Sequence, residues 1–252
     1  MLDANHAARA GGQAPELVCI LCHGYGAPGD DLVGIGAAVL DVAPALAGRV
    51  AFAFPEAPQS IPGMPSGRAW FQIDVARFGL ALATGDLEQL FDDVPDGLAE
   101  ARKALTATVH DVARKLSLPM SRVVLGGFSQ GSMVATEVAL RLEDAPAALA
   151  ILSGTLLNRA EWAARAAKRT AMPVLQSHGT EDPILPYLAA VALRDMLTKA
   201  GVAVDFVSFR GGHGIAPNAI HKLAALLSST LAKLASSSPS GAPPGASSGA
   251  SS

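Results

Sequence analysis

The chain contains little charge and few aromatic residues for its length. Of its 252 residues, 16% are charged and 5% are aromatic, and its 22 acidic side chains slightly outnumber its 19 basic ones. Proteins that bind a nucleic-acid backbone usually gather lysine and arginine into a basic patch or run, and this sequence has no such run. We therefore expect no nucleic-acid partner.

Long apolar segments are also missing. No stretch reaches the ~20 apolar residues that a membrane-spanning helix needs. Residues 1–16 include Asp3, Asn5 and Arg9 and lack the apolar stretch of a signal peptide, so we interpret them as an N-terminal leader. These absences predict a protein that has no integral membrane segment and works in the cytoplasm.

Only two cysteines are present, and both lie in one apolar segment. Cys19 and Cys22 are not spaced like a disulfide framework, so we expect reduced thiols. The string Cys19-Ile20-Leu21-Cys22-His23 does match the short pattern for covalent haem attachment. Its apolar character predicts a β-strand, however, in which residues three apart point to opposite faces. We therefore interpret both residues as core cysteines.

Short β-rich segments alternate with helical patterns along the chain, and half of the residues are hydrophobic. This alternation predicts an α/β fold with a mostly parallel central sheet and helices on both faces. Apolar residues recur at steps of three and four from Leu98 to Leu116 and from Ile220 to Leu234, which predicts two amphipathic helices. The predicted strands are Leu17 to Leu21, Val50 to Phe54, Arg122 to Leu125, Ala148 to Leu152, Val174 to Gln176 and Val204 to Phe209.

The composition also sets the expected domain boundaries. A chain of this length and apolar content buries a substantial core, so residues 17–235 are expected to form one domain. From Ser236 to Ser252 the chain contains only Ser, Gly, Ala and Pro, which predicts a disordered tail.

A serine lies on a predicted sharp turn directly after an apolar run. In Gly127-Phe128-Ser129-Gln130-Gly131, small flanking residues allow a strained strand-to-helix elbow that exposes the Ser129 hydroxyl above the sheet. A serine hydroxyl is a weak nucleophile at neutral pH unless a base accepts its proton and an acid orients that base. Ser129 is thus the candidate nucleophile.

Candidates for the acid and the base follow in the order that this architecture requires. Asp182 comes after a predicted strand, and His213 lies in Gly211-Gly212-His213-Gly214 after another. The other histidines lie upstream of the acid or within predicted helices. We predict Asp182 and His213 as acid and base, with Glu181 as the alternative acid; structural roles for them, as a helix N-cap and a hydrogen-bonded histidine, remain alternatives.

Two backbone amides are candidates for an oxyanion hole. The first strand is followed by His23-Gly24-Tyr25-Gly26, whose glycines allow the Tyr25 N–H to turn toward a crevice, although a simple tight turn is the alternative. The Gln130 N–H lies at a predicted helix start, where unpaired amides and the helix dipole favour negative charge.

Four motifs together resemble the phospholipase/carboxylesterase family of α/β hydrolases, which includes acyl-protein thioesterases and small bacterial carboxylesterases. The resemblance implies the α/β-hydrolase fold, the catalytic triad Ser129, Asp182 and His213, and oxyanion donors at Tyr25 and Gln130. The motifs are Leu21-Cys22-His23-Gly24-Tyr25-Gly26, Gly126-Gly127-Phe128-Ser129-Gln130-Gly131, His178-Gly179-Thr180-Glu181-Asp182-Pro183 and Gly212-His213.

The function expected from these residues is hydrolysis of carboxylic esters or thioesters through an acyl-serine intermediate, on small acyl substrates. It needs neither a metal nor an organic cofactor. Trp70, Phe71 and Phe78 are expected to line an acyl channel, or alternatively to anchor their loop to the core. A non-catalytic protein that uses the same fold to bind acyl ligands is the alternative function. The natural substrate, the chain length and the oligomeric state are left open.

Overall fold

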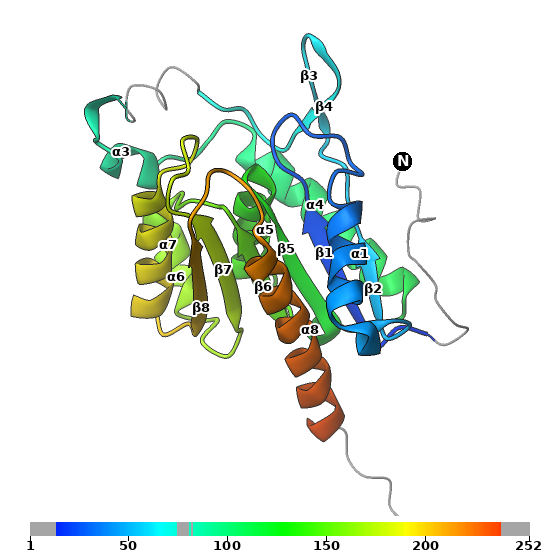
Figure 1. Ribbon diagram of the computed structural model, residues 1–252. Coiled ribbons are helices and arrows are strands. Elements are labelled where there is room, and N and C mark those ends of the chain that lie inside the picture. The colour runs from blue at the N-terminus through cyan, green and yellow to red at the C-terminus, as the bar shows by residue number, and fades with distance from the viewer. Residues whose placement is uncertain (1–13, 75–80, 82, 238–252) are drawn as a thin grey trace, which may run out of the picture.

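Six parallel strands form the central sheet of the protein (Figure 1). The computed structural model describes residues 14–74, 81 and 83–237. The order across the sheet is β2-β1-β5-β6-β7-β8, and every neighbouring pair is parallel. The expected parallel sheet is therefore confirmed. Its strands are β1 (Leu17–Cys22), β2 (Val50–Ala53), β5 (Val123–Phe128), β6 (Ala148–Leu152), β7 (Val174–Gly179) and β8 (Val204–Phe209).

Helices cover both faces of this sheet, as expected. Helices α1 (Val33–Val42) and α8 (Pro217–Ser237) share one hydrophobic cluster with the sheet and lie on its near face in Figure 1. The second cluster lies on the other face and draws most of its buried helical residues from four helices. These are α4 (Leu98–Lys115), α5 (Gln130–Arg141), α6 (Arg159–Ala166) and α7 (Tyr187–Lys199).

Five shorter elements lie between the long helices and the strands of the main sheet. Strands β3 (Gln59–Ile61) and β4 (Met64–Ala69) form a separate antiparallel hairpin, and α3 (Glu88–Phe91) is a single helical turn. Two 3₁₀ turns, Pro44–Leu46 and Met120–Arg122, precede β2 and β5.

The two cysteines lie in β1 and point to opposite faces of the sheet. Cys19 packs in the cluster of α1 and α8, whereas Cys22 packs in the cluster of α4 and α5. Both are fully buried, and burial raises the pKa of the Cys19 thiol to about 12 and that of the Cys22 thiol further still. The interpretation as core cysteines is confirmed, because two thiols on opposite faces cannot hold one haem.

Two predicted strands are longer in the structure than the apolar pattern indicated. β5 continues past Leu125 through Gly126 and Gly127, which pair with Ala150 and Ile151 of β6. β7 likewise continues past Gln176 to Gly179. Backbone pairing continues where the apolar side chains stop. The glycines and polar residues that follow therefore belong to the carboxyl ends of these strands.

The last helix also extends beyond its predicted end. Ser236 and Ser237, the first residues of the predicted tail, belong to α8, because a helix that is already formed continues through any residue other than proline or glycine at little cost. The rest of the predicted tail lies outside the described residues. Within the described ranges, no helix is both long enough and apolar enough to cross a bilayer.

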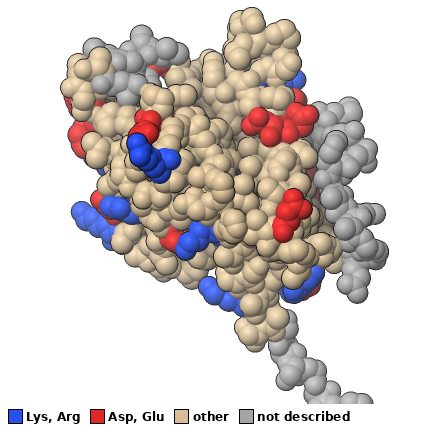
Figure 2. Space-filling view, in the orientation of Figure 1, with Lys and Arg blue, Asp and Glu red and all other residues tan. Residues whose placement is uncertain are grey.

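Mixed charge is visible on the face of the molecule in Figure 2. Basic and acidic side chains occur there in small groups separated by uncharged surface. Several described pairs are ionic, for example Lys222 with Asp205 at 2.9 Å and Arg210 with Glu181 at 3.0 Å. Such exposed pairs contribute little to stability, typically about 0–1 kcal/mol.

Candidate active site

Loops at one edge of the sheet carry the residues that the motifs singled out. Ser129 follows β5, Asp182 follows β7, and His213 follows β8. Because the strands are parallel, their carboxyl ends share one edge, where ligands bind in open α/β sheets. Three segments that are distant in the sequence thereby meet.

Ser129 has a backbone conformation that serine rarely adopts. Its φ is 52° and its ψ is −125°, immediately before α5 begins. Strain of this kind costs about 1–3 kcal/mol and persists only where the surroundings enforce it. Here the Ser129 N–H donates to the Leu152 carbonyl at 2.9 Å, and its carbonyl accepts from the Ser132 N–H at 3.0 Å. Both ends of the turn are therefore held, as the predicted elbow requires.

Glycines make this elbow possible because backbone approaches them closely. A Cβ on Gly131 would overlap the carbonyl oxygens of Cys22 and His23, and a Cβ on Gly127 would lie 2.6 Å from the Cys22 oxygen. The first turn of α5 thus packs directly against the end of β1. Any larger residue at either position would push the serine turn away from the loop after β1.

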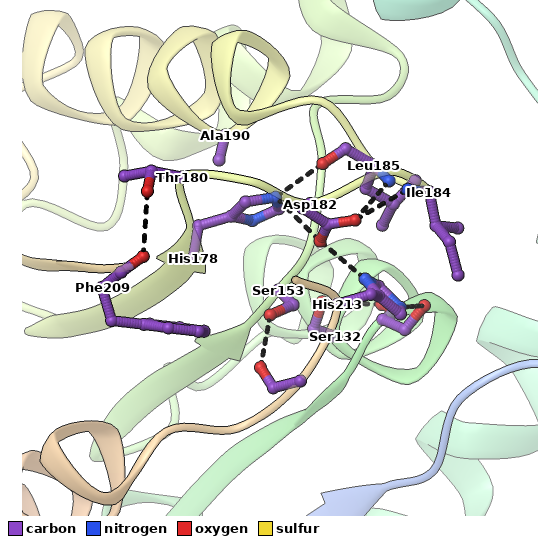
Figure 3. Close-up of polar contacts among 12 residues, drawn as sticks. Ser132, Ser153, His178, Thr180, Asp182, Ile184, Leu185, Ala190, Phe209 and His213 are labelled. Atoms are coloured by element: carbon purple, nitrogen blue, oxygen red, sulfur yellow. Dashed lines mark hydrogen bonds and ion pairs between the residues drawn. The ribbon is translucent and has the colours of Figure 1, made fainter. Parts of the chain in front are cut away.

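The side chains of Ser129, His213 and Asp182 form a continuous hydrogen-bonded chain. Figure 3 shows the His213–Asp182 contact of this chain. His213 Nε2 lies 2.9 Å from Ser129 Oγ, and His213 Nδ1 lies 2.7 Å from Asp182 Oδ2. A carboxylate only accepts, so Nδ1 carries the proton and Nε2 presents a lone pair to the serine hydroxyl. This arrangement can take a proton from the hydroxyl while the carboxylate stabilises the resulting imidazolium.

Asp182 is held as a buried anion. Burial by itself raises the pKa of its carboxyl, but hydrogen bonds from His178, from His213 and from the Leu185 and Ile184 amides outweigh this and hold the pKa well below its usual value. The two amides donate to Oδ1, each at 2.9 Å. The alternative acid, Glu181, instead pairs with Arg210 on the exposed surface. Asp182 is thus the carboxylate that contacts His213.

The loop that carries His213 is anchored to neighbouring strand ends. Ser153, buried at the end of β6, donates from Oγ to the Gly214 carbonyl at 2.8 Å. The Phe128 ring lies 4.8 Å from the imidazole, centroid to centroid. These contacts fix the imidazole from two sides and leave its side chain 12% exposed.

Tyr25 and Gln130, the two predicted oxyanion donors, lie beside the serine. Both line the cavity next to Ser129. Among the turns and caps of the described residues, neither the Tyr25 N–H nor the Gln130 N–H donates to a backbone carbonyl.

Buried side chains connect the loops around this pair of amides. The side-chain amide of Gln130 accepts from the Trp70 N–H through Oε1 at 2.9 Å and donates to the Phe71 carbonyl through Nε2 at 2.8 Å. The Trp70 indole donates to the His23 carbonyl at 2.9 Å, and His23 Nε2 accepts from the Ala57 N–H at 3.0 Å. Burial lowers the pKa of His23, which keeps the ring neutral for this role.

A cavity of about 950 Å³ opens beside the serine. It is large enough for an acyl chain, and most of its walls are apolar. Seven segments line it: the loop after β1, the segment after β4, α3 with its flanking residues, the end of β5 with the start of α5, and the loops after β6, β7 and β8. The apolar residues that line it include Phe71, Leu87, Leu90, Met133, Leu156, Leu157, Leu185 and Ala189.

The three predicted channel residues have different positions. Phe71 lines the cavity. Trp70 does not: the prediction that it lines the channel is wrong, because its ring is 1% exposed and is held in the core by the hydrogen bond to His23. The anchoring alternative describes Trp70 correctly. Phe78 lies outside the described residues.

Sequence reasoning missed three side chains that support the site. His23, His178 and the Gln130 amide are all buried and hydrogen-bonded to groups near the triad. Each lies inside a motif that was recognised for a neighbouring residue. The sequence does contain a signal for them. Each is a polar side chain at or next to the end of a buried strand, and a buried polar side chain needs a hydrogen-bond partner.

Comparison with known proteins shows which family the chain belongs to. The sequence profile of the phospholipase/carboxylesterase family matches residues 4–231. Acyl-protein thioesterase 1 of Mycosarcoma maydis is 30% identical over 239 residues, which cover 87% of this chain and 93% of that protein. The match to acyl-protein thioesterase 1 of Neurospora crassa, also 30% identical, is shorter and covers 52% of this chain and 57% of that protein.

Solved structures show the same fold. The crystal structure of esterase PE8 superposes with a TM-score of 0.71 at 28% identity, covering 86% of this chain and 94% of that one. Acyl-protein thioesterase 2 of Zea mays shares the fold with a TM-score of 0.63 at 23% identity, covering 88% and 96% of the two chains. Because the profile covers most of the sequence and the fold agrees, the chain belongs to the phospholipase/carboxylesterase family and is a hydrolase of esters or thioesters.

Proposed function

We propose that the protein hydrolyses carboxylic esters or thioesters of small acyl substrates through an acyl-serine intermediate. The observation that carries this proposal is the unbroken chain from Ser129 Oγ through His213 to Asp182, with distances of 2.9 and 2.7 Å, beside an apolar cavity. The relatives named thioesterases and esterases support both substrate classes.

The first half of the reaction acylates the serine. His213 Nε2 accepts the Ser129 hydroxyl proton as Oγ attacks the carbonyl carbon, and the carbonyl electron pair moves to oxygen. The Tyr25 and Gln130 amides receive that oxyanion, each contributing about 2.7–4 kcal/mol of transition-state stabilisation. The imidazolium then returns its proton to the departing alcohol or thiol. The acyl group remains on Oγ, with its chain in the cavity.

The second half reverses this path with water. His213 accepts a proton from water as the hydroxide attacks the acyl-serine carbonyl, and the same amides hold the second oxyanion. Collapse breaks the bond to Oγ, which takes its proton back from the imidazolium. The carboxylic acid leaves, and no metal or organic cofactor takes part in any step.

The alternative of a non-catalytic acyl-binding protein is tested by covalent labelling. We expect a fluorophosphonate probe to label Ser129 and p-nitrophenyl butyrate to be hydrolysed. The Ser129→Ala variant should lose both while its melting temperature stays close to that of the wild type. A folded wild-type protein that neither labels nor hydrolyses the ester would favour the binding function instead.

Two buried, unpaired thiols fit a reducing compartment. We therefore place the activity in the cytoplasm. Fractionation of cells that express the tagged chain tests this, and recovery of the esterase activity in the extracellular fraction would contradict it.

A further inference from the structure

A second histidine contacts the buried carboxylate of Asp182 (Figure 3). His178 is fully buried in β7, and its Nε2 lies 2.8 Å from the Leu185 carbonyl and 3.3 Å from Asp182 Oδ2. The ring thus joins the strand before the acid to the end of the loop that carries the acid. The mechanism above does not use this side chain.

The hydrogen-bond partners determine where the proton of His178 resides. A carbonyl oxygen only accepts, so Nε2 must carry the proton that it donates to Leu185. Nδ1 is buried and has no hydrogen-bond partner among the described residues. The Nε2 proton is therefore donated to the Leu185 carbonyl, and the Asp182 carboxylate lies 3.3 Å from the same nitrogen.

With His178 included, four N–H groups surround the Asp182 carboxylate. Oδ1 accepts from the Ile184 and Leu185 amides, and Oδ2 accepts from His213 and lies 3.3 Å from His178 Nε2. The two amides belong to the same loop as the acid, whereas His178 belongs to the sheet. We propose that His178 is a positioning residue for the catalytic acid, whose N–H fixes the orientation of Oδ2 toward His213 and shares its negative charge; this inference rests on the proposed function.

Another buried side chain of β7, Gln176, allows the positioning role of His178 to be separated from a purely structural one. Gln176 lies two residues before His178 and therefore on the same face of β7. It is equally buried, and its Nε2 donates to the Ala190 carbonyl at 2.8 Å, also in the segment that follows the acid. Among the described residues, Gln176 makes no hydrogen bond or ion pair with Asp182, so it shares the anchoring role of His178 but not the contact with the acid.

Few titratable groups face this site. His213 and Ser129 come from two loops at the sheet edge, and the Tyr187 ring of α7 lies 6.3 Å from the His178 ring. The carboxylates Asp31, Asp74, Asp93 and Asp96 line the same cavity farther along. Because they are unchanged in every His178 variant, a comparison between two such variants cancels their contribution to the pH profile.

The test compares His178→Gln with His178→Met in the full-length chain. The two side chains have the same length, but only glutamine retains an N–H near the position of Nε2. We expect kcat for p-nitrophenyl butyrate to be at least ~10-fold lower in the Met variant than in the Gln variant, because the acid is no longer held in place. We also expect the acid limb of the kcat/KM profile to lie at higher pH in the Met variant, because a carboxylate without this donor favours a protonated imidazole more strongly.

Gln176→Met is the matched control. This variant removes a buried amide from the same face of β7. It should therefore lower the melting temperature without moving the acid limb of the kcat/KM pH profile. Equal kcat and equal acid limbs in the two folded His178 variants would overturn the proposal. A shift of the same size in Gln176→Met would also overturn it, because the effect would then come from anchoring alone.

A measurement on the wild type covers the case in which the His178 variants do not fold. Phosphonylation of Ser129 by a fluorophosphonate should move the ¹⁵N signals of the His178 ring, because the shared carboxylate then faces a protonated His213. The exposed His110 of α4 should not respond. Unchanged His178 signals in the labelled protein would overturn the inference, whereas failure of Ser129 to label would overturn the proposed function on which it rests.

Discussion

At the scale of single residues, the site depends on where protons are held. The Asp182 carboxylate keeps Nδ1 of His213 protonated, which leaves Nε2 free to accept the Ser129 proton. The sequence predicted these three residues because motif spacing placed each one directly after a strand. It did not predict that Trp70 turns into the core, since the direction of an aromatic ring in a loop depends on a carbonyl contributed by His23, 47 residues away.

The role of the acid can be tested without changing its shape. Asp182→Asn preserves size but replaces one carboxylate oxygen with an N–H, so it should stabilise the wrong tautomer of His213 and lower kcat by about 10⁴-fold. Initial rates with p-nitrophenyl butyrate measure this loss. Glu181→Gln, a control at the adjacent exposed carboxylate, should leave kcat unchanged. A loss below tenfold in Asp182→Asn, or a large loss in Glu181→Gln, would show that the acid is misassigned.

At the scale of elements, the contact between α5 and the end of β1 sets the geometry of the oxyanion site. Gly131 in the first turn of α5 lies against the Cys22 and His23 carbonyls, directly before the loop that carries Tyr25. The sequence predicted the turn but not how far the strands extend around it. Apolar residues mark only the first part of β5 and β7, whereas Gly126, Gly127 and Ser177, which are also buried, extend the pairing without an apolar signal.

Adding a single methyl group tests this contact. Gly131→Ala should destabilise the fold by about 1–3 kcal/mol through overpacking and should also reduce kcat, because α5 must shift away from Tyr25. Gly34→Ala is the matched control: Gly34 is exposed in α1, with nothing near an added Cβ, and the change should stabilise by about 0.5–1 kcal/mol. Chemical denaturation and steady-state kinetics measure both effects. A Gly131→Ala enzyme with unchanged stability and kcat would contradict the close packing.

At the scale of the whole molecule, the cavity is the feature that the sequence could not define. Its walls come from seven separate segments, and residues such as Met133, Leu156 and Ala189 are indistinguishable from core residues in the sequence. The α/β architecture could be predicted because it depends on periodicity along the chain. The cavity depends on how far apart loops from different strands lie, which periodicity does not encode.

Buried ionisable groups make the stability of the whole fold depend on pH. The pKa of His23 is lowered by burial, so below about pH 6.5 the unfolded chain binds a proton that the folded chain resists. The free energy of unfolding should therefore decrease as the pH falls from 7 toward 5. The pKa of Asp182 is also lowered, and its stabilisation should be complete above about pH 4 and lost at lower pH.

Melting temperatures between pH 7 and pH 5 test the first of these effects. His23→Gln keeps an oxygen that can accept the Ala57 N–H but does not titrate in this range. Its melting temperature should change less with pH than that of the wild type. Identical pH dependence in the two proteins would show that His23 does not couple folding to pH.

The central claim is that a covalent acyl group forms on Ser129. Rapid acid quenching during turnover of p-nitrophenyl butyrate, followed by mass spectrometry of the digested protein, tests it most directly. The account predicts one butyryl group on the peptide that contains Ser129 in the wild type and none in Ser129→Ala, which should not turn over. Sustained turnover with no acyl group on that peptide, or with an acyl group on another residue, would contradict it.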